Sequence, residues 1–473
     1  MGRAFRSLAW TVLVSVALSA QAPGPAGGSA SSPAIDKTWI SYADARPVFR
    51  TLPDNLPVPL KGKPPEEIEA AWPTWVSQHD AEIRGRLERG DEDSIVNLWL
   101  FGTSFTRLPP ARDSDIAARG APGSLANVLR RRLDDLVNAI ASPGANERIQ
   151  FARQFVEGKG LDPTTARGKI QVRQLLIAAR DRAVAEYRAS DGTLERARGR
   201  NEPNAEITAY ATIFRQRGLS SDTSVLADFA VEQTLRSLKS GGILAAGTVR
   251  RVAVVGPGLD FLNKADGLDV YPQQTIQPFA LVDALLQLEL AQPNDLRVTT
   301  FDLSPRVNHH LGEAVQQANV GQPYVLHLPL GGRERWTPDL VRYWERLGDR
   351  VGEEEQADPP SDRSDVRIRA VRVRPAVVQS IVPRDVNIVV ERLEPMAPAE
   401  RFDLVVATNI FVYYDPFEQA LAVANVASML RPAGVLLANT LVPLTPPMRS
   451  SAAHAVITYS DRQYDHMFWY QRE

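Results

Sequence analysis

Two glycines and one aspartate near the middle of the chain could together hold a nucleotide-like ligand. Gly256-Pro257-Gly258 ends the apolar run Val252–Val255, and a glycine turn after a strand lets a ligand approach the backbone closely. Asp302 follows the next β-rich run, Arg297–Phe301, where a carboxylate can accept hydrogen bonds from both hydroxyls of a ribose. Each feature alone has a plainer interpretation, a tight turn for the glycines and a helix cap for the aspartate beside Ser304-Pro305. Together, in this order, they favour a nucleoside ligand.

Other chemistries find little support in the sequence. The chain has no cysteine, which excludes disulfides, thiolate zinc sites and cysteine nucleophiles. The adjacent histidines, His309 and His310, would point about 100° apart on a helix and lack a metal-binding spacing. No G-x-S-x-G elbow and no Walker-type loop is present. The formal net charge is −2, so no global positive field indicates nucleic acid. We therefore expect no metal and no nucleic-acid partner.

The elements that must position the glycine turn and Asp302 begin after Val249. Short β-rich runs alternate with helical stretches there, which is typical of a parallel sheet with helices on both faces. Ligands of such sheets lie at the carboxyl ends of the strands, near the switch in strand order. The predicted strands are Arg251–Val255, Arg297–Phe301, Val386–Val390, Phe402–Ala407 and Val435–Asn439, and the predicted helices are Pro278–Leu290, Pro305–Gln317 and Pro416–Leu430. A final pair of runs, Ala455–Tyr459 and His466–Tyr470, predicts an antiparallel hairpin that closes the sheet edge.

Four further segments complete the predicted organisation. Residues 23–72 are rich in proline, glycine and serine and indicate a linker followed by an extended arm. Residues 73–247 have apolar residues at three- and four-residue steps, as an all-helical domain requires. The α/β domain spans 248–473, and an insertion at about 321–374 interrupts its alternation. Within the insertion we expect a helix at Trp336–Leu347 and a mobile loop at Gly348–Asp365.

The first 22 residues have the layout of a secretory signal peptide. Arg3 and Arg6 precede the apolar run Leu8–Leu18, and Ala20-Gln21-Ala22 fits a cleavage site. The sequence thus predicts export to the periplasm or the exterior, or a cytoplasmic protein if the leader is not functional. No other segment approaches 18 unbroken apolar residues, so we expect no transmembrane segment in the mature chain.

The segment FDLVVATNIFVYYDPFEQALAVANVASMLRPAGVLLANT, residues 402–440, resembles strands four and five of class I S-adenosylmethionine-dependent methyltransferases. It is most similar to the branch that methylates chemotaxis-receptor glutamates. Asn409, Tyr413, Asp415-Pro416 and the late turn Leu430–Gly434 match that branch. Two more segments resemble its helix opening and its second-strand segment, namely Thr275–Leu286 and Thr300–Leu311. The resemblance covers about 220 residues from Val249 onward. It implies a Rossmann-like methyltransferase sheet, here preceded by an all-helical domain.

The resemblance also implies a cofactor and a set of site residues. S-adenosylmethionine would be held by Gly256, Gly258, Gln277, Asp302 and Asn409, and Tyr413 would lie near the substrate. The methyl acceptor, a protein or a small molecule, and the catalytic residues stay unknown. The sequence departs from the branch at Val254, Asp260, Gln277 and Thr408, where an acid, a third glycine, a glutamate and an arginine are usual. Two alternatives stay open: an exported, non-catalytic methyltransferase-like binding protein, and another nucleotide-binding α/β enzyme such as an oxidoreductase.

Overall fold

The computed structural model describes residues 36–473 except 112–122, 200–217, 222, 224, 263–267, 332–334, 358–365 and 462. Residues 35–473 form one compact unit. The predicted signal peptide and the linker that follows it lie outside the described residues, so export stays a prediction. Among the helices of the described ranges, none combines the length and the apolar character needed to cross a bilayer.

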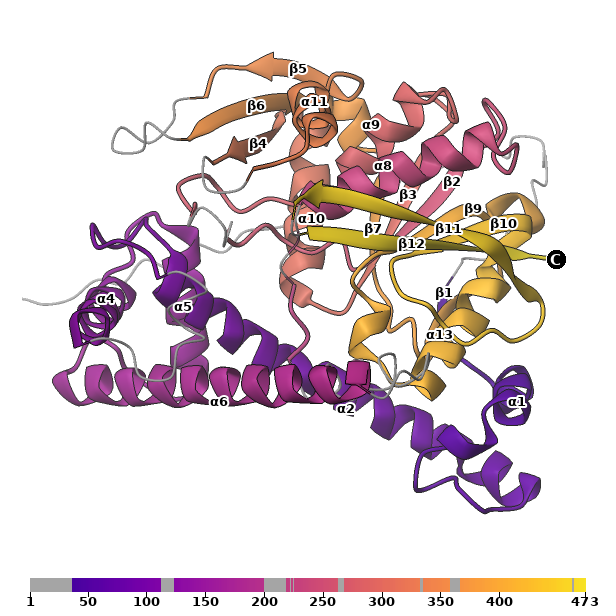
Figure 1. Ribbon diagram of the computed structural model, residues 1–473, viewed down its shortest axis with the longest axis horizontal. Coiled ribbons are helices and arrows are strands. Elements are labelled where there is room, and N and C mark those ends of the chain that lie inside the picture. The colour runs from indigo at the N-terminus through magenta and orange to yellow at the C-terminus, as the bar shows by residue number, and fades with distance from the viewer. Residues whose placement is uncertain are drawn as a thin grey trace, which may run out of the picture. The chain divides into compact units, whose positions relative to one another are not determined.

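A seven-stranded sheet with the order β11-β12-β10-β9-β2-β3-β7 forms the α/β region (Figure 1). Its strands are β2 (Arg251–Val255), β3 (Arg297–Asp302), β7 (Ile381–Asp385), β9 (Phe402–Ala407), β10 (Leu430–Ala438), β11 (Met448–Ser460) and β12 (Gln463–Arg472). The strands from β7 to β10 are parallel, whereas β12 is antiparallel to both β10 and β11. The expected Rossmann-like sheet with a C-terminal antiparallel hairpin is confirmed.

The strand order reverses direction between β2 and β9. From β2 the chain adds β3 and then β7 on one side, and it later adds β9 and then β10 on the other. The first turns of the helices that follow β2 and β9 therefore diverge, which opens a crevice at the carboxyl ends of these two strands. The topology alone thus predicts a ligand site at the carboxyl ends of β2 and β9.

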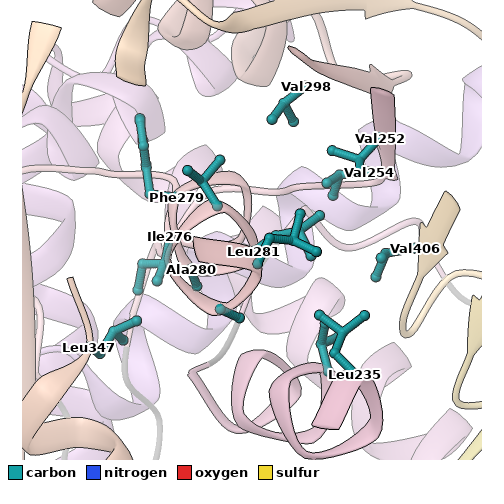
Figure 2. Close-up of a cluster of buried hydrophobic side chains, with 14 of the residues drawn as sticks. Leu235, Val252, Val254, Ile276, Phe279, Ala280, Leu281, Val298, Leu347 and Val406 are labelled. Atoms are coloured by element: carbon teal, nitrogen blue, oxygen red, sulfur yellow. The ribbon is translucent and has the colours of Figure 1, made fainter. Parts of the chain in front are cut away.

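Alternate residues of each strand face two different helical layers, because side chains alternate across a pleated strand. Val252 and Val254 of β2 pack with α8 (Val225–Ser240), α9 (Gln277–Gln287) and α10 (Pro305–Asn319). Figure 2 shows Leu281 of α9 and Leu235 of α8 near these two valines. Ala253 and Val255 pack on the opposite face with α1 (Tyr42–Thr51), α13 (Pro416–Met429) and the first half of α2 (Pro65–Phe101). Burial on both faces explains why β2 and β9 read as continuous apolar runs.

Helix α2 joins the sheet to a second, all-helical core. Trp72, Trp75 and Ile83 belong to the core that covers the sheet, whereas Ile95 and Trp99 belong to a core formed with other helices. Those helices are α4 (Gly123–Ala141), α5 (Glu147–Gly158) and α6 (Ala166–Gly199). The helical region expected before the sheet is confirmed, with α2 starting at Pro65 and continuing through Pro73. Helix α8 packs on α9, β11 and β12 rather than on these helices. The exact domain boundaries stay a prediction.

Two stretches differ from the sequence-based expectation on the N-terminal side and after β7. The segment predicted as an extended arm contains α1, which Ser41 caps, and a short 3-10 turn, Pro53–Asn55. The predicted strand Val386–Val390 is wrong, because the strand there is β7 and residues 386–390 form a loop. The loop leads into β8 (Glu391–Glu394), which pairs with β1 (Asp36–Trp39). The apolar residues of that loop are buried against α13, so their pattern reflects burial and not strand pairing.

The insertion forms a small antiparallel sheet of its own. Its order is β4-β6-β5, with β4 (Tyr324–Leu330), β5 (Gly352–Glu355) and β6 (Arg367–Val373). The helix expected around Trp336–Leu347 is α11 (Pro338–Arg346). A mobile loop is predicted from Gly348, but β5 lies within that range, and residues 358–365 of the range fall outside the described residues. A short helix, α12 (Pro375–Val378), then leads to β7.

Candidate functional site

A pocket lies at the carboxyl ends of β2, β3 and β9, where the strand order reverses. The centre of a water molecule can reach about 90 Å³ of it, and all the space between its walls and its open mouth amounts to about 790 Å³. All six residues singled out from the sequence line it: Gly256, Gly258, Gln277, Asp302, Asn409 and Tyr413. Its wall also includes Leu87 of α2 and the segment 219–221. The six predicted residues span 157 positions of the sequence, from 256 to 413. They meet at the crevice where the strand order reverses.

The glycine turn is required by the backbone itself. Gly256 and Gly258 have φ angles of +65° and +63°, a region that side chains with a Cβ adopt only under strain. A Cβ on Gly256 would lie 2.1 Å from Cδ1 of Ile410, and one on Gly258 would lie 2.5 Å from the carbonyl oxygen of Ser221. The N–H of Leu259 donates to that same Ser221 carbonyl over 2.7 Å. The turn is thus packed closely against both Ile410 and the segment that crosses it.

Asp302 is a buried carboxyl group on the wall of the pocket, with 8% of its surface exposed. Its Oδ1 accepts from the N–H of Ser304 at 2.8 Å, and its Oδ2 has only a long contact, 3.5 Å, with the N–H of Gly258. Burial raises the pKa of Asp302 to about 6, although both N–H groups and the charge of Arg306 oppose the rise. One oxygen holds the N–H of Ser304, the residue before α10, but α10 has no side-chain cap hydrogen bond, so Asp302 is not a helix cap. The other oxygen is only weakly engaged and can accept a ligand hydroxyl.

Apolar side chains flank Asp302 inside the pocket. Leu303 follows it directly, and Val386 and Ile388 come from the loop after β7. These two residues were missed as site residues because their apolar run predicts a strand. The position of the run, just beyond the carboxyl end of a strand adjacent to β3, is the signal that could have identified them. An apolar slot beside an acid is suited to a flat ring attached to a hydroxylated sugar.

Gln277 begins α9, and its side chain is hydrogen-bonded to that of Thr408. Its Nε2 lies 2.7 Å from the hydroxyl oxygen of Thr408, and both side chains are buried. These are two of the positions that depart from the family pattern, where a glutamate and an arginine are usual. This neutral hydrogen bond ties the helix opening to the end of β9.

Asn409 projects from the end of β9 with a φ of +59°, a left-handed conformation that asparagine tolerates. Its backbone N–H donates to Oδ1 of Asn439 at 2.8 Å, and Nδ2 of Asn439 donates to Oδ1 of Asn409 at 2.6 Å. A backbone N–H can only donate, so this contact fixes which end of the Asn439 amide is oxygen, and that in turn fixes the Asn409 amide. Asn409 therefore has its own Nδ2 available as a donor at the exposed lip.

The lip continues through Tyr413 and Tyr414. The buried guanidinium of Arg86, on α2, donates from Nη2 to the carbonyl oxygen of Tyr413 at 2.8 Å. Burial raises the pKa of Tyr414 above its ordinary value, and the nearby charge of Arg86 opposes that rise. Sequence reasoning missed Arg86 because α2 is nearly 330 residues away in the chain. Among the described residues that line the pocket, Asp302 is the only carboxylate, and none is a histidine or a lysine.

Asp260, at the third glycine position, has a structural role of its own. Its side chain accepts from Nε2 of Gln274 at 3.0 Å and from the hydroxyl of Tyr271 at 3.2 Å. Arg148 of α5, which is 2% exposed, donates to the carbonyl oxygens of Phe261 and Tyr271. The loop after the glycine turn is therefore a surface on which the helical region docks.

Two other sequence features lie away from the pocket. Nε2 of His309 is 3.3 Å from Glu313, whereas Nε2 of His310 is 2.8 Å from the hydroxyl of Tyr324, so the two histidines have different partners. Val254 is buried in the core with Leu281, as Figure 2 shows, and so lies outside the pocket.

Comparisons with known proteins return only distant structural likenesses. No family model matches the sequence, and no curated protein matches it either. The N-methyltransferase NodS from Bradyrhizobium japonicum is 13% identical, with 52% of this chain and 96% of that chain covered and a TM-score of 0.26. Magnesium protoporphyrin IX methyltransferase from Synechocystis with bound SAM is 11% identical, with 53% and 81% covered and a TM-score of 0.25. An O-methyltransferase family 2 protein from Planctomyces limnophilus is 11% identical, with 84% and 96% covered and a TM-score of 0.22. At these scores the likeness decides neither the fold nor the activity.

Proposed function

We propose that this chain is an S-adenosylmethionine-dependent methyltransferase and that its acceptor atom is a carboxylate oxygen. The observation that carries the proposal is the meeting of a left-handed glycine turn, a buried acid at the end of β3 and the β9 lip in one pocket. This pocket occupies the strand-order reversal, where sheets of this kind bind their ligands. The residue motifs from 402 to 440 support the same family.

The pocket residues fit the parts of that cofactor. Asp302 would accept hydrogen bonds from the ribose hydroxyls through its weakly engaged oxygen. The apolar side chains of Leu303, Val386 and Ile388 would cover the adenine ring. The backbone of the turn at Gly256 and Gly258, which lines the pocket, would contact the methionine portion, and the glycines let the turn pack against Ile410 and Ser221 in this position. When bound, the cofactor supplies an electrophilic methyl group on a sulfonium, which a nucleophile removes by in-line displacement.

The class of methyl acceptor follows from two properties of the lip, namely a hydrogen-bond donor and the lack of a general base among its described residues. An amine or an alcohol must lose a proton during the reaction, yet the described lining residues include no base besides Asp302. A carboxylate is already ionised at neutral pH, because its ordinary pKa is about 4, and needs no base. Nδ2 of Asn409 would donate to one of its oxygens. This matches the chemotaxis-receptor branch, whose acceptors are glutamate carboxylates. The carboxylate could belong to a protein or to a small molecule.

Apolar side chains around the lip would make such a carboxylate more reactive. Leu87, Leu219 and Ile410 line the pocket and would remove water from the acceptor oxygen. The chain's contribution is therefore to bind, orient and desolvate the two reactants. No proton transfer by a side chain is required.

Calorimetric titration of the full chain with S-adenosylmethionine and S-adenosylhomocysteine tests the proposal. We expect dissociation constants of about 1–100 µM, the range common for enzyme substrates and cofactors. Methylated acceptors should release methanol on treatment with base, since a carboxyl methyl ester is base-labile and an N-methyl group is not. If the folded protein binds neither compound at 1 mM, the proposal is wrong and the non-catalytic binding protein takes its place.

Export by residues 1–22 is a separate proposal that bears on this one. S-adenosylmethionine is made in the cytosol, so an exported chain would lack a ready supply of methyl donor. If the chain stays in the cytosol with its leader uncleaved, methyltransferase activity is compatible with its location. Complete export of the chain favours the non-catalytic alternative.

A further inference from the structure

The amide of Asn409 is held by a chain of hydrogen bonds that begins in the C-terminal hairpin. The hydroxyl of Tyr459 on β11 donates to Oδ2 of Asp465 on β12 at 2.9 Å. Asp465 is also hydrogen-bonded to the side chain of Asn439, which follows β10. Oδ1 of Asn439 accepts from the backbone N–H of Asn409, and Nδ2 of Asn439 donates to Oδ1 of Asn409. The lip of the pocket is thus connected to the sheet edge through three polar side chains.

The direction of every bond in this chain is determined. An ionised carboxylate can only accept, so Asp465 must receive a hydrogen from Nδ2 of Asn439. The backbone N–H of Asn409 requires the oxygen of Asn439 on the other side. Both constraints orient the Asn439 amide in the same way, so its second N–H donates to Oδ1 of Asn409. What remains for a ligand is the NH₂ group of Asn409.

We propose that Asn439 determines the acceptor class by fixing which end of the Asn409 amide meets the acceptor. This inference rests on the proposed function, since it concerns the acceptor lip of the same pocket. With the present pair, the lip donates a hydrogen bond and selects an acceptor that carries lone pairs and no hydrogen, such as a carboxylate. A pair with reversed polarity would turn the Asn409 amide over and present its oxygen, which selects an N–H or ammonium group. Asn439 is therefore a positioning residue that acts through Asn409, and Asp465 supports the orientation of the Asn439 amide.

The exchange of the two side chains reverses the polarity without changing the number of charges. In the double variant Asn439→Asp/Asp465→Asn, the carboxylate at 439 still accepts from the Asn409 N–H but can no longer donate to Oδ1 of Asn409. The Asn409 amide must then rotate so that its NH₂ faces that carboxylate. The amide at 465 can donate to the new carboxylate and accept from Tyr459, so every partner in the chain is kept. The single variant Asp465→Asn keeps the orientation of Asn439 and is the matched control.

Nuclear magnetic resonance of protein labelled with ¹⁵N-asparagine tests the proposal, with acetate and methylammonium as minimal probes and S-adenosylhomocysteine present. The side-chain signal of Asn409 is assigned by its loss in Asn409→Asp. In the parent and in Asp465→Asn, acetate should shift this signal in a saturable way and methylammonium should not. In the double variant we expect at least a tenfold loss of acetate affinity, as for one lost charge-assisted hydrogen bond, and a response to methylammonium.

The possible outcomes separate this inference from the proposed function. Thermal melts and titration with S-adenosylhomocysteine establish that each variant folds and keeps its cofactor site. If the double variant binds S-adenosylhomocysteine as the parent does yet retains the parent's preference for acetate, the inference is overturned and the proposed function stands. An Asn409 signal that ignores acetate in the parent also overturns it. If the parent fails to bind S-adenosylhomocysteine, the proposed function fails, while the response to acetate alone still reports on the amide polarity.

Discussion

Replacing Asp302 by asparagine should make the ligand-free protein more stable and its cofactor binding weaker. The pKa of Asp302 is about 6, against an ordinary value of 3.8, because burial disfavours the charged carboxylate. At pH 7.5 the group is ionised in both the folded and the unfolded chain, so the raised pKa is a cost to folding of roughly 3 kcal/mol. Asparagine removes the charge and can keep the 2.8 Å bond from Ser304. It loses only the 3.5 Å contact with Gly258.

The size of the stabilisation by Asp302→Asn depends on pH in a way that identifies its cause. Between pH 3.8 and about 6 the folded state binds more protons at Asp302 than the unfolded state does, so the cost appears as the pH rises through this window. The advantage of Asp302→Asn should therefore be full at pH 7.5 and shrink toward pH 4.5. After subtraction of the lost contact with Gly258, we expect Asp302→Asn to raise the free energy of unfolding by about 2 kcal/mol at pH 7.5. This corresponds to a few degrees in melting temperature for a chain of this size.

Affinity should change in the opposite direction. Losing a charge-assisted acceptor for the ribose hydroxyls costs about 1.5–3 kcal/mol, or roughly one to two decades in the dissociation constant of S-adenosylhomocysteine. The parent should also bind more weakly as the pH falls below about 6, because a protonated carboxyl is a poorer acceptor, whereas the variant should not.

Thermal melts and calorimetry at pH 5 and pH 7.5 measure both quantities. The matched control is Asp295→Asn, which makes the same substitution at an exposed residue just before the opposite end of β3 and should change neither quantity. A variant that is less stable and binds S-adenosylhomocysteine as tightly as the parent would refute the reasoning. In that case Asp302 would serve only to hold the N–H of Ser304 before α10.

Three further substitutions test the surroundings of the site. Gly258→Ala places a Cβ in a left-handed position against backbone and should lower both the melting temperature and the affinity for S-adenosylhomocysteine, whereas Gly312→Ala, on a helix with open space around it, should stabilise by about 0.5–1 kcal/mol. Burial lowers the pKa of His79, but hydrogen bonding and charge from Glu418 outweigh it and raise the pKa overall. Denaturant titrations should therefore show that the parent loses stability as the pH rises from 6.5 through this raised pKa, and that His79→Gln does not. Arg148→Met leaves buried carbonyls of the loop after the glycine turn without their donor, so it should lower melting temperature and affinity together, and unchanged affinity would show that the docking has no effect on the pocket.

The sequence predicts the centre of the fold well, because the pattern there has a single physical cause. Strands β2 and β9 are found at the predicted residues, since parallel strands covered on both faces are apolar over most of their length. The run Val386–Val390 has the same composition but is buried as a loop, and periodicity cannot distinguish the two cases. The true strand, β7, contains Pro383, which fits its place at the edge of the sheet.

Some residues of the candidate site can likewise be predicted from the sequence, and others cannot. Residues that directly follow a strand of the parallel sheet, such as Gly256, Asp302 and Asn409, can be predicted because strand ends share one edge. Leu87 and Arg86 cannot, since nothing local in α2 indicates which of its faces meets the pocket. Asn439 ends a predicted strand, but its importance depends on the hydrogen bond to Asn409, which only the register of β9 and β10 brings about.

Helix α2 belongs to two hydrophobic cores, and this determines how the protein can open. Amide hydrogens exchange with solvent when their hydrogen bonds break, so the slowest of them report the largest cooperative opening. Since α2 continues without a break from Trp72 in the sheet's core to Trp99 among α4, α5 and α6, one core can open alone only if α2 breaks in its middle turns, which costs the helical hydrogen bonds there (Figure 1). The two cores should therefore exchange as one unit through the middle turns of α2. Leu87 lies in those turns, so the wall of the pocket is placed where the motion of either core is transmitted to the other.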